Sequence, residues 1–153
     1  MVFAVTGDFY THQVETKIFN PLGMKSATYG FDGLRAGNNW ARPHVYGKRG
    51  WVPETPSENY YHVPPAAGVN ASITDMAIWL NAQLGHRPDV LSPALLEKIH
   101  SPQVATPSEL RSSGWRHARL SRASYGLGWR VFTYQGRTLI FHGGLLRGYQ
   151  GVI

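Results

Sequence analysis

The stretch Phe141-His142-Gly143-Gly144 places one imidazole and two glycines directly after the run Arg137-Thr138-Leu139-Ile140. Beta-branched and apolar residues bounded by glycines are typical of strands. A second apolar run follows within 145–153. A histidine at a strand end beside glycines lies where a backbone edge can approach a ligand closely. The same residues also suit a plain hairpin whose glycines only make the turn. The rest of the sequence has to separate these two interpretations.

Composition indicates one folded domain. The chain has 153 residues, and domains commonly have about 100–200. Aromatic residues are plentiful, with 5 Trp, 8 Tyr and 6 Phe, so the composition is not that of a disordered chain. The net charge is +6, but there is no dense Lys/Arg run and no recognisable nucleic-acid-binding module. We therefore interpret the charge as a solvated basic face and expect no nucleic-acid partner.

Several kinds of chemistry have no signal in this sequence. The absence of cysteine excludes disulfides and thiolate chemistry and leaves the compartment open. No apolar run reaches the roughly 18 residues that a membrane span needs, and the first five residues lack the charged and apolar regions of a signal peptide. The seven His are dispersed without ligand spacing, so we expect no metal. No glycine-rich phosphate loop precedes a helix, and we expect no cofactor.

The N-terminal part has a helical pattern. Val14 and Ile18 are four positions apart and share one helix face, which predicts a helix at about 9–19. Thr6-Gly7-Asp8 is expected to separate it from an earlier helical piece. Pro21 is expected to end it, because proline cannot continue a helix.

A second helix has the clearest local signal. Ser72 and Asp75 have the spacing of a capping box, with Asp in place of Glu or Gln. They predict a helix at about 73–84, and Gly85 is placed to end it. Its expected apolar face consists of Met76, Trp79, Leu80 and Leu84.

Downstream, the pattern changes from helix to strand. Ser92 and Pro93 suit the N-cap and the first position of a helix at about 93–100. Residues 103–123 are interpreted as a polar loop that carries several arginines. The expected strands are at about 125–133, 137–142 and 148–153, with a hairpin turn at Tyr134-Gln135-Gly136-Arg137. The predicted fold class is α+β, with antiparallel strands.

The region 25–66 shows little periodicity. Glycines and prolines recur throughout it, and aromatic residues are scattered between them. We expect a long, loop-rich excursion, and its aromatic content favours an ordered wall over a free linker. The aromatics of 40–61 either pack in a core or line a substrate-binding surface, and the former interpretation is preferred.

Four segments occur in a fixed order along the chain. They are Ile18-Phe19-Asn20-Pro21-Leu22-Gly23-Met24; Pro65-Ala66-Ala67-Gly68-Val69 with Ser72, Asp75, Met76 and Ala77; Tyr125-Gly126-Leu127-Gly128-Trp129; and His142-Gly143-Gly144 with Gly148-Tyr149. Taken together and in this order, they resemble the class C beta-lactamase-like serine hydrolases, a family that includes beta-lactamases, D-alanyl-D-alanine peptidases and related esterases. The resemblance covers essentially the whole chain, and it implies part of a beta-lactamase/transpeptidase-like fold.

The resemblance also implies a site. In that family a Ser-x-x-Lys motif supplies the nucleophile, a Tyr-x-Asn motif supplies a second proton-handling group, and a Lys-Thr-Gly or His-x-Gly triplet forms a third wall. His142-Gly143-Gly144 matches the triplet in its His variant. His142 is then implied to shape the electrostatics of the site, while the two glycines leave room for an acyl group. The backbone N–H of Leu145 is implied to stabilise the oxyanion.

The departures from the family pattern limit what this stretch of chain can do. No serine has Lys three positions later, and no tyrosine has Asn two positions later. Residues 1–153 are therefore expected to be a partial beta-lactamase-like domain that lacks the N-terminal motif region and the C-terminal end. We expect a piece of a serine hydrolase that acts on amide or ester bonds of small-molecule substrates through an acyl-enzyme. The 153 residues alone are expected to be inactive.

Some properties stay open at this stage. The His in the third triplet favours peptidase or esterase-like members over beta-lactamases, because Lys would bind a beta-lactam carboxylate more directly. The family implies a periplasmic or secreted protein, while the sequence leaves the oligomeric state open. Two alternatives remain: a non-catalytic binding module or degraded remnant of the same fold, and an unrelated basic binding domain. Upstream Ser-x-x-Lys and Tyr-x-Asn motifs would favour the enzyme, whereas steeply salt-dependent nucleic-acid binding would favour the basic domain.

Overall fold

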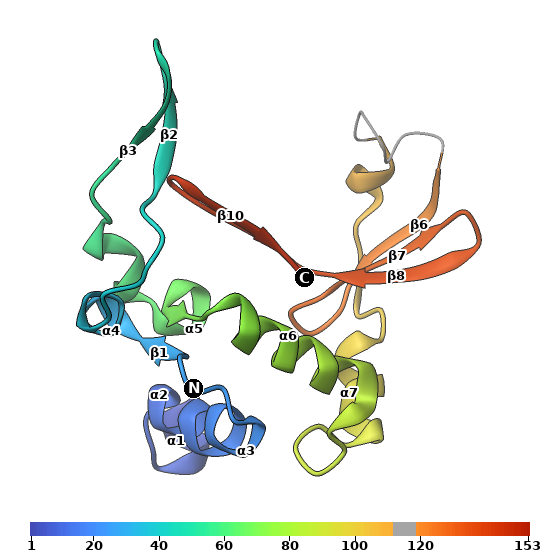
Figure 1. The fold of residues 1–153 in the computed structure, drawn as a ribbon. Coiled ribbons are helices and arrows are strands. Elements are labelled where there is room, and N and C mark those ends of the chain that lie inside the picture. The colour runs from blue at the N-terminus through green and yellow to red at the C-terminus, as the bar shows by residue number, and fades with distance from the viewer. Residues whose placement is uncertain (112–118) are drawn as a thin grey trace. The chain divides into compact units, whose positions relative to one another are not determined.

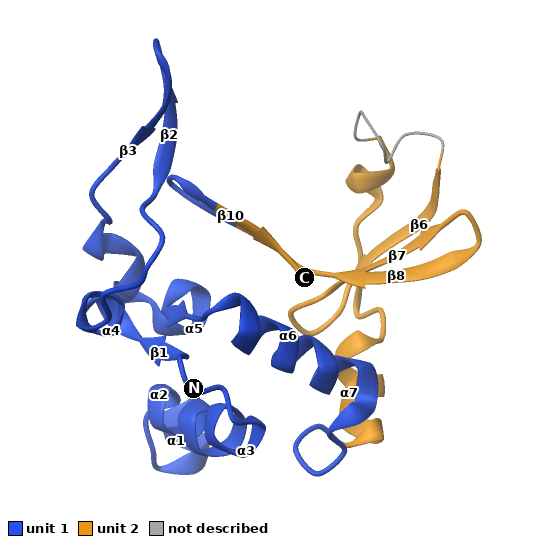
Figure 2. Ribbon diagram, viewed as in Figure 1, with its two compact units in different colours: residues 1–91, 145–149 blue, residues 92–144, 150–153 orange. Residues whose placement is uncertain are grey.

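Two units make up the computed structural model, which describes residues 1–111 and 119–153 (Figure 1). Unit 1 contains residues 1–91 and 145–149, and unit 2 contains residues 92–144 and 150–153 (Figure 2). The described residues combine helices with antiparallel sheets, as the α+β prediction requires. They include no helix long and apolar enough to cross a membrane.

Unit 1 begins with helices separated where the sequence predicts. Helix α1 (Val2–Thr6) ends at Gly7, whose φ is 71°. Helix α2 (Tyr10–Val14) then runs through a π-helical segment, η1 (Glu15–Phe19), into α3 (Asn20–Leu22). The expectation that Pro21 ends this helix is wrong. Proline lacks a backbone N–H, and it is tolerated in the first turn of an α-helix, which is where Pro21 lies in α3. The left-handed Gly23, with φ 77°, ends the helix instead.

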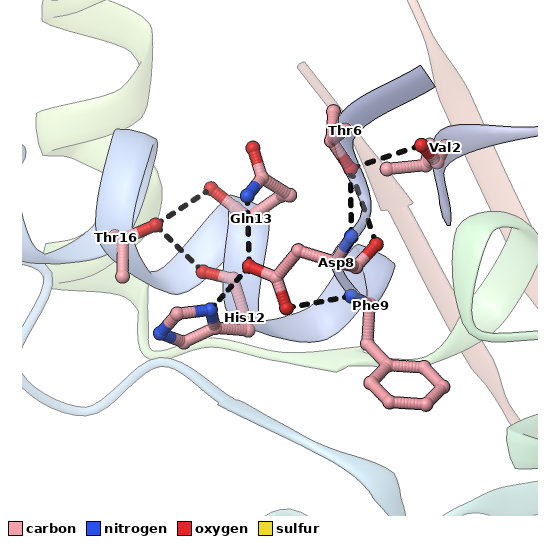
Figure 3. A network of polar contacts seen from close by, with 7 residues as sticks. All are labelled: Val2, Thr6, Asp8, Phe9, His12, Gln13 and Thr16. Carbon is pink, nitrogen blue, oxygen red and sulfur yellow. Dashed lines mark hydrogen bonds and ion pairs between the residues drawn. The ribbon is translucent and has the colours of Figure 1, made fainter. Parts of the chain in front are cut away.

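The start of α2 is held by Asp8 (Figure 3). The Asp8 carboxylate accepts hydrogen bonds from the Phe9 N–H at 2.7 Å and from Gln13 Nε2 at 2.8 Å, and it also contacts His12 Nδ1. The His12 contact is the largest cause of a lowered pKa at Asp8. These contacts satisfy a backbone donor at the start of the helix and link its first turn to the preceding loop.

The capping box predicted at Ser72 is present. In α6 (Ile73–Asn81), Ser72 Oγ accepts from the Asp75 N–H at 3.1 Å, and Asp75 Oδ2 accepts from the Ser72 N–H at 3.1 Å. The π-helical segment η3 (Ala82–His86) continues the helix and includes the left-handed Gly85. The predicted apolar face is wrong at Leu80 and Leu84, which are 44% and 65% exposed. The fully buried positions of α6 and η3 are Asp75, Ala82 and Gln83.

The hydrophobic core of unit 1 gathers around the turn that follows α3. Phe19, Leu22 and Met24 are each about 5–6% exposed. Tyr29 stacks on Phe19 with ring centroids 5.3 Å apart. These apolar side chains thus cover one side of the helical segment formed by η1 and α3.

The loop-rich region 25–66 contains several short elements, and none of them is longer than the seven-residue α4 (Gly30–Ala36). Strand β1 (Thr28–Tyr29) pairs antiparallel with β4 (Val69–Asn70). The other elements are the hairpin β2 (His44–Gly47) and β3 (Gly50–Pro53), the 3₁₀ segment η2 (Glu58–His62) and α5 (Pro64–Ala67).

The β2–β3 hairpin corrects the expectation for the aromatics of this region. Tyr46 and Trp51 are paired across the hairpin, with ring centroids 5.5 Å apart. They are 75% and 70% exposed, so neither is a core residue. The hairpin shows no alternation in the sequence because neither face of it is buried within the described chain.

Among its described residues, unit 2 contains one α-helix and a four-stranded sheet. Helix α7 (Pro93–His100) begins at Ser92, whose Oγ accepts from the Leu95 N–H at 3.3 Å, as predicted. The sheet has the antiparallel order β5-β6-β7-β8. Its strands are β5 (Val104–Ala105), β6 (Leu120–Tyr125), β7 (Arg130–Tyr134) and β8 (Arg137–Phe141), with the 3₁₀ segment η4 (Pro107–Arg111) between β5 and β6.

The core of unit 2 is aromatic. Phe132 on β7 is 1% exposed and packs edge-on against Phe141, with ring centroids 5.2 Å apart. Trp129 packs edge-on against His100 at 5.3 Å. Burial at this contact lowers the pKa of His100. One contact thus joins β7 to β8 within the sheet, and the other joins α7 to the residue that precedes β7.

The predicted strand at 125–133 is correct at 130–133, which belong to β7, and wrong at 126–129. Residues 126–129 form the connection between β6 and β7, in which the Gly126 N–H donates to the Trp129 carbonyl at 2.7 Å and Gly128 has φ 85°. A Cβ on Gly126 would lie 2.7 Å from the Ile99 carbonyl oxygen, so a side chain has no room there. In the sequence these glycines look like part of an apolar alternation. In the structure, one of them allows a turn and the other allows a close approach of two backbone segments.

Strand β6 lies partly in residues that were expected to form a polar loop at 103–123. Ala123 is the only one of its six residues that is buried, so the strand has no apolar alternation to reveal it. Residues 112–118 of that expected loop lie outside the described residues.

The last strands agree better with the sequence. The predicted strand at 137–142 is β8, and the turn before it is confirmed, with φ 47° at Gln135 and 76° at Gly136. The predicted strand at 148–153 is β10 (Tyr149–Val152). It pairs with β9 (Gly143–Leu146), a strand that the sequence pattern did not predict, because two glycines occupy half of it.

Candidate active site

His142 lies between β8 and β9, where its backbone is fixed and its side chain is exposed. Its N–H donates to the Ile153 carbonyl at 2.9 Å, and its carbonyl accepts from the Ile153 N–H at 3.0 Å. The imidazole faces the ring of Tyr125 edge-on, with centroids 6.5 Å apart. Tyr125 ends β6, so the sheet of unit 2 places an aromatic ring beside the imidazole. Tyr125 belongs to one of the four segments that carry the family resemblance, but the sequence did not predict its contact with His142.

Gly143 and Gly144 are part of β9 and not of a turn. The interpretation in which they only make the turn of a hairpin is therefore wrong. A Cβ on either residue would meet no atom within 4 Å, and both residues are exposed. Packing within the described chain does not require glycine at these two positions. Because these two residues have no side chains, there is open space along the strand directly after His142.

The Leu145 N–H points away from β10. His142 and Ile153 exchange both of their backbone hydrogen bonds. Hydrogen-bonded and non-hydrogen-bonded pairs alternate along an antiparallel ladder. The N–H groups that point toward β10 are therefore those of Gly144 and Leu146, and those of Gly143 and Leu145 point to the opposite edge.

That opposite edge of β9 is open. Within the described ranges, β9 pairs with β10 and with no other strand. The Leu145 side chain is 78% exposed. An unpaired strand edge offers N–H donors and carbonyl acceptors to an extended segment of a ligand. The residue that sequence analysis selected as a backbone donor thus has its N–H on an edge that a ligand can reach.

Within unit 1, the two-residue turn after β9 is bonded to Glu54 by contacts that the sequence did not reveal. The Arg147 guanidinium donates two hydrogen bonds to the Glu54 carboxylate, at 2.7 and 2.6 Å. The hydrogen bonds from Arg147 are the largest cause of a lowered pKa at Glu54, and those to Glu54 raise the pKa of Arg147. No local motif joins these residues, because 93 positions separate them.

Two cavities that are lined partly by polar side chains do not include His142 or its neighbours. A cavity of about 240 Å³ in unit 2 is lined partly by His100, Arg122, Ser124 and Thr133, and one of about 350 Å³ in unit 1 lies beside Phe19 and Tyr29. Neither includes any residue of 142–145. Within residues 1–111 and 119–153, no group of three or more His, Asp and Glu side chains is arranged to hold a metal ion.

Comparison with known proteins identifies the family. The Beta-lactamase family model matches residues 1–153, and the chain belongs to that family. The chain is 30% identical over 152 residues to the unguisins hydrolase ungD' of Aspergillus campestris, an alignment that covers 97% of this chain and 27% of that protein.

Two solved structures have a similar fold. The octameric penicillin-binding protein homologue from Pyrococcus abyssi matches with a TM-score of 0.79 and 22% identity, over 99% of this chain and 32% of that one. A penicillin-binding protein from Bacillus halodurans matches with a TM-score of 0.65 and 21% identity, over 97% of this chain and 40% of that one. The chain thus spans between about a quarter and two fifths of the length of these proteins.

Proposed function

We propose that the whole protein containing these residues is a serine hydrolase that cleaves amide or ester bonds of small-molecule substrates through an acyl-enzyme. Residues 1–153 are proposed to be part of a larger beta-lactamase-like domain, of which this chain supplies one wall of the active site. Membership of the Beta-lactamase family supports the class of enzyme. The observation that carries the assignment of the wall is the outward-pointing Leu145 N–H on the open edge of β9.

The wall has a definite task in this proposal. When a serine hydroxyl attacks a carbonyl carbon, negative charge develops on the carbonyl oxygen, and fixed N–H donors stabilise that charge. The Leu145 N–H is proposed as one such donor. Gly143 and Gly144 present no side chain that would keep the acyl group from the strand edge. His142, beside Tyr125, is proposed to orient the substrate and to adjust the electrostatics of the site.

The nucleophile is proposed to lie outside residues 1–153. None of the serines in this sequence has Lys three positions later, and none of the tyrosines has Asn two positions later. Removing the nucleophile from such a site leaves only binding and modest oxyanion stabilisation. The 153 residues alone are therefore proposed to be inactive in acyl transfer.

The proposed substrates are the broad class of small-molecule amides and esters. The Aspergillus campestris relative is named for the hydrolysis of unguisins, and the proposal for this protein is the broader class of amides and esters. A histidine at position 142 favours a peptidase or esterase over a beta-lactamase, because it is a weaker fixed cation than lysine. A periplasmic or secreted location is proposed from the family alone.

Active-site labelling tests this proposal. The whole protein and the isolated chain 1–153 are each incubated with a fluorescent fluorophosphonate and with a fluorescent penicillin. The whole protein is expected to be labelled at one serine, and the chain 1–153 at none. In the whole protein, His142→Ala is expected to slow labelling by about 10- to 100-fold, because the carbonyl would be held less accurately.

Two outcomes would overturn parts of the proposal. Stoichiometric labelling of the chain 1–153 at one of its own serines would show that the nucleophile lies inside it. A whole protein that contains no Ser-x-x-Lys and is not labelled would favour the second candidate, a non-catalytic binding module of the same fold. That candidate is kept because the two motifs are absent from the sequence described here.

A further inference from the structure

The turn between β9 and β10 is held by several independent contacts from unit 1. The Arg147 N–H donates to Tyr60 Oη at 3.1 Å, in addition to the two guanidinium bonds to Glu54. The Gly148 carbonyl accepts from the His44 N–H at 2.9 Å. The Tyr149 hydroxyl donates to the Ala41 carbonyl at 2.9 Å. Both residues of the turn, and Tyr149 directly after it, are thus bonded to residues of η2 and of the β2–β3 hairpin and its flanks.

Gly148 makes this approach possible. It has φ 79°, and a Cβ there would lie 2.6 Å from the Pro43 Cβ and 2.8 Å from the His44 backbone nitrogen. Pro43 is fully buried. The turn therefore lies against backbone that cannot give way, unlike the open surroundings of Gly143 and Gly144.

We propose that Arg147, acting through Glu54 and Tyr60, is a positioning residue that sets the direction of the Leu145 N–H in the active site. This inference rests on the proposed function. Leu145 lies on β9, two residues before Arg147, which is the first residue of the turn. A strand rises about 3.3 Å per residue and is stiff over that length. Fixing the position and tilt of the turn thus fixes the last residues of β9.

The Arg147–Glu54 pair is better suited to orienting the turn than to stabilising the fold. The Arg147 side chain is 67% exposed and that of Glu54 is 29% exposed, and exposed pairs add little to the stability of a fold. A guanidinium that donates two parallel bonds to one carboxylate defines an angle as well as a distance. The Tyr60 bond to the backbone of the same residue removes a further degree of freedom. Catalysis by a backbone donor depends on such accuracy, because a displacement of about 1 Å can cost on the order of 100-fold in rate.

The central test compares variants of the whole protein in hydrolysis of a p-nitrophenyl ester. Arg147→Ala is expected to lower kcat by about 10- to 100-fold with KM little changed, because the group affected acts on the transition state. Arg147→Lys keeps the charge but loses the two parallel bonds, and is expected to be intermediate. Glu54→Gln is expected to be less active than the parent, and the exchange of both partners, Glu54→Arg with Arg147→Glu, is expected to restore part of the loss.

Arg87→Ala provides the matched control. Arg87 also donates two bonds to a carboxylate, that of Asp89, and one to a backbone carbonyl, that of Pro21, within unit 1. None of these partners belongs to β9, β10 or the turn between them. The control is expected to keep the parent's kcat. A kcat loss in Arg87→Ala equal to that in Arg147→Ala would show that any surface pair of this kind has the same effect, and it would overturn the positioning role.

A second readout separates this inference from the proposed function. Amide hydrogen exchange at Leu145 and Leu146 is measured in the parent and in Arg147→Ala. Faster exchange of the Leu146 amide is expected in the variant even if the protein hydrolyses no ester, because that N–H depends on the β9–β10 pairing. Unchanged exchange together with unchanged kcat would overturn the positioning role. Absence of ester hydrolysis in the parent, with faster exchange in the variant, would overturn the proposed function alone.

Discussion

Two glycines show how the same backbone conformation can serve different purposes. Gly7 and Gly148 both have a left-handed φ, 71° and 79°. A Cβ on Gly7 would meet no atom within 4 Å, whereas one on Gly148 would overlap Pro43 and His44. Gly7 is therefore required only by its own conformation, and Gly148 is required also by the segment against which it lies.

This difference predicts unequal costs of substitution. Gly7→Ala is expected to lower the free energy of unfolding by about 1–2 kcal/mol, which is the cost of a left-handed alanine. Gly148→Ala is expected to cost about 1–3 kcal/mol more, because the added methyl also displaces packed backbone. Urea denaturation of the whole protein measures both values. Equal losses in the two variants would contradict the close contact at Gly148.

At the scale of single elements, the start of α6 combines a local cap with a distant contact. Ser72 and Asp75 exchange side-chain and backbone bonds within the helix start. Asp75, which is 2% exposed, also accepts the Ser26 N–H at 3.4 Å through Oδ1. One carboxylate therefore begins the helix and ties it to the segment that follows α3.

The cap and the contact can be separated by mutation. Ser72→Ala removes cap bonds and is expected to cost about 1 kcal/mol of unfolding free energy. Asp75→Ala is expected to cost about 1–3 kcal/mol beyond that, since it leaves the Ser72 and Ser26 N–H groups without their acceptor. Comparison of the two variants by urea denaturation tests the difference. If Asp75→Ala proved no more costly than Ser72→Ala, the contact with Ser26 would contribute nothing.

At the scale of the whole molecule, each of the two units has buried side chains of its own among the described residues. Phe19, Leu22 and Met24 belong to unit 1, and Trp129, Val131 and Phe132 belong to unit 2. The chain passes between the units within the β9–β10 hairpin, whose turn belongs to unit 1 (Figure 2). Local stability is expected to follow this division, because each core is buried by its own contacts.

Phe132→Ala tests that division. Removing a ring that is 1% exposed is expected to cost about 3–5 kcal/mol within unit 2. Hydrogen exchange in the whole protein should then speed up at Val131 and Leu139, while the Met24 amide, which donates to the Phe19 carbonyl at 2.9 Å, should stay protected. Equal loss of protection at all three amides would show that the two cores unfold as one.

The success of prediction from the sequence depended on how far apart the interacting residues are. The capping box at Ser72, the N-cap at Ser92 and the turn at Gln135-Gly136 were predicted correctly, because their bonds join residues within three positions. Strands β6 and β9 were missed, since one has a single buried side chain and the other begins with two glycines. The family resemblance, which rests on short motifs in order, was confirmed over the whole chain.

For the candidate site, the sequence and its family resemblance selected the residues that are proposed to carry the chemistry: His142, the two bare glycines and the backbone of Leu145. Their roles remain the proposals made above. Only the tertiary structure decided that the Leu145 N–H points to an open strand edge, and that Arg147 holds the adjacent turn through Glu54. The physical reason is range. A motif records what neighbouring residues do, whereas the direction of the Leu145 N–H follows from the pairing of His142 with Ile153, and the turn is bonded to a residue 93 positions away.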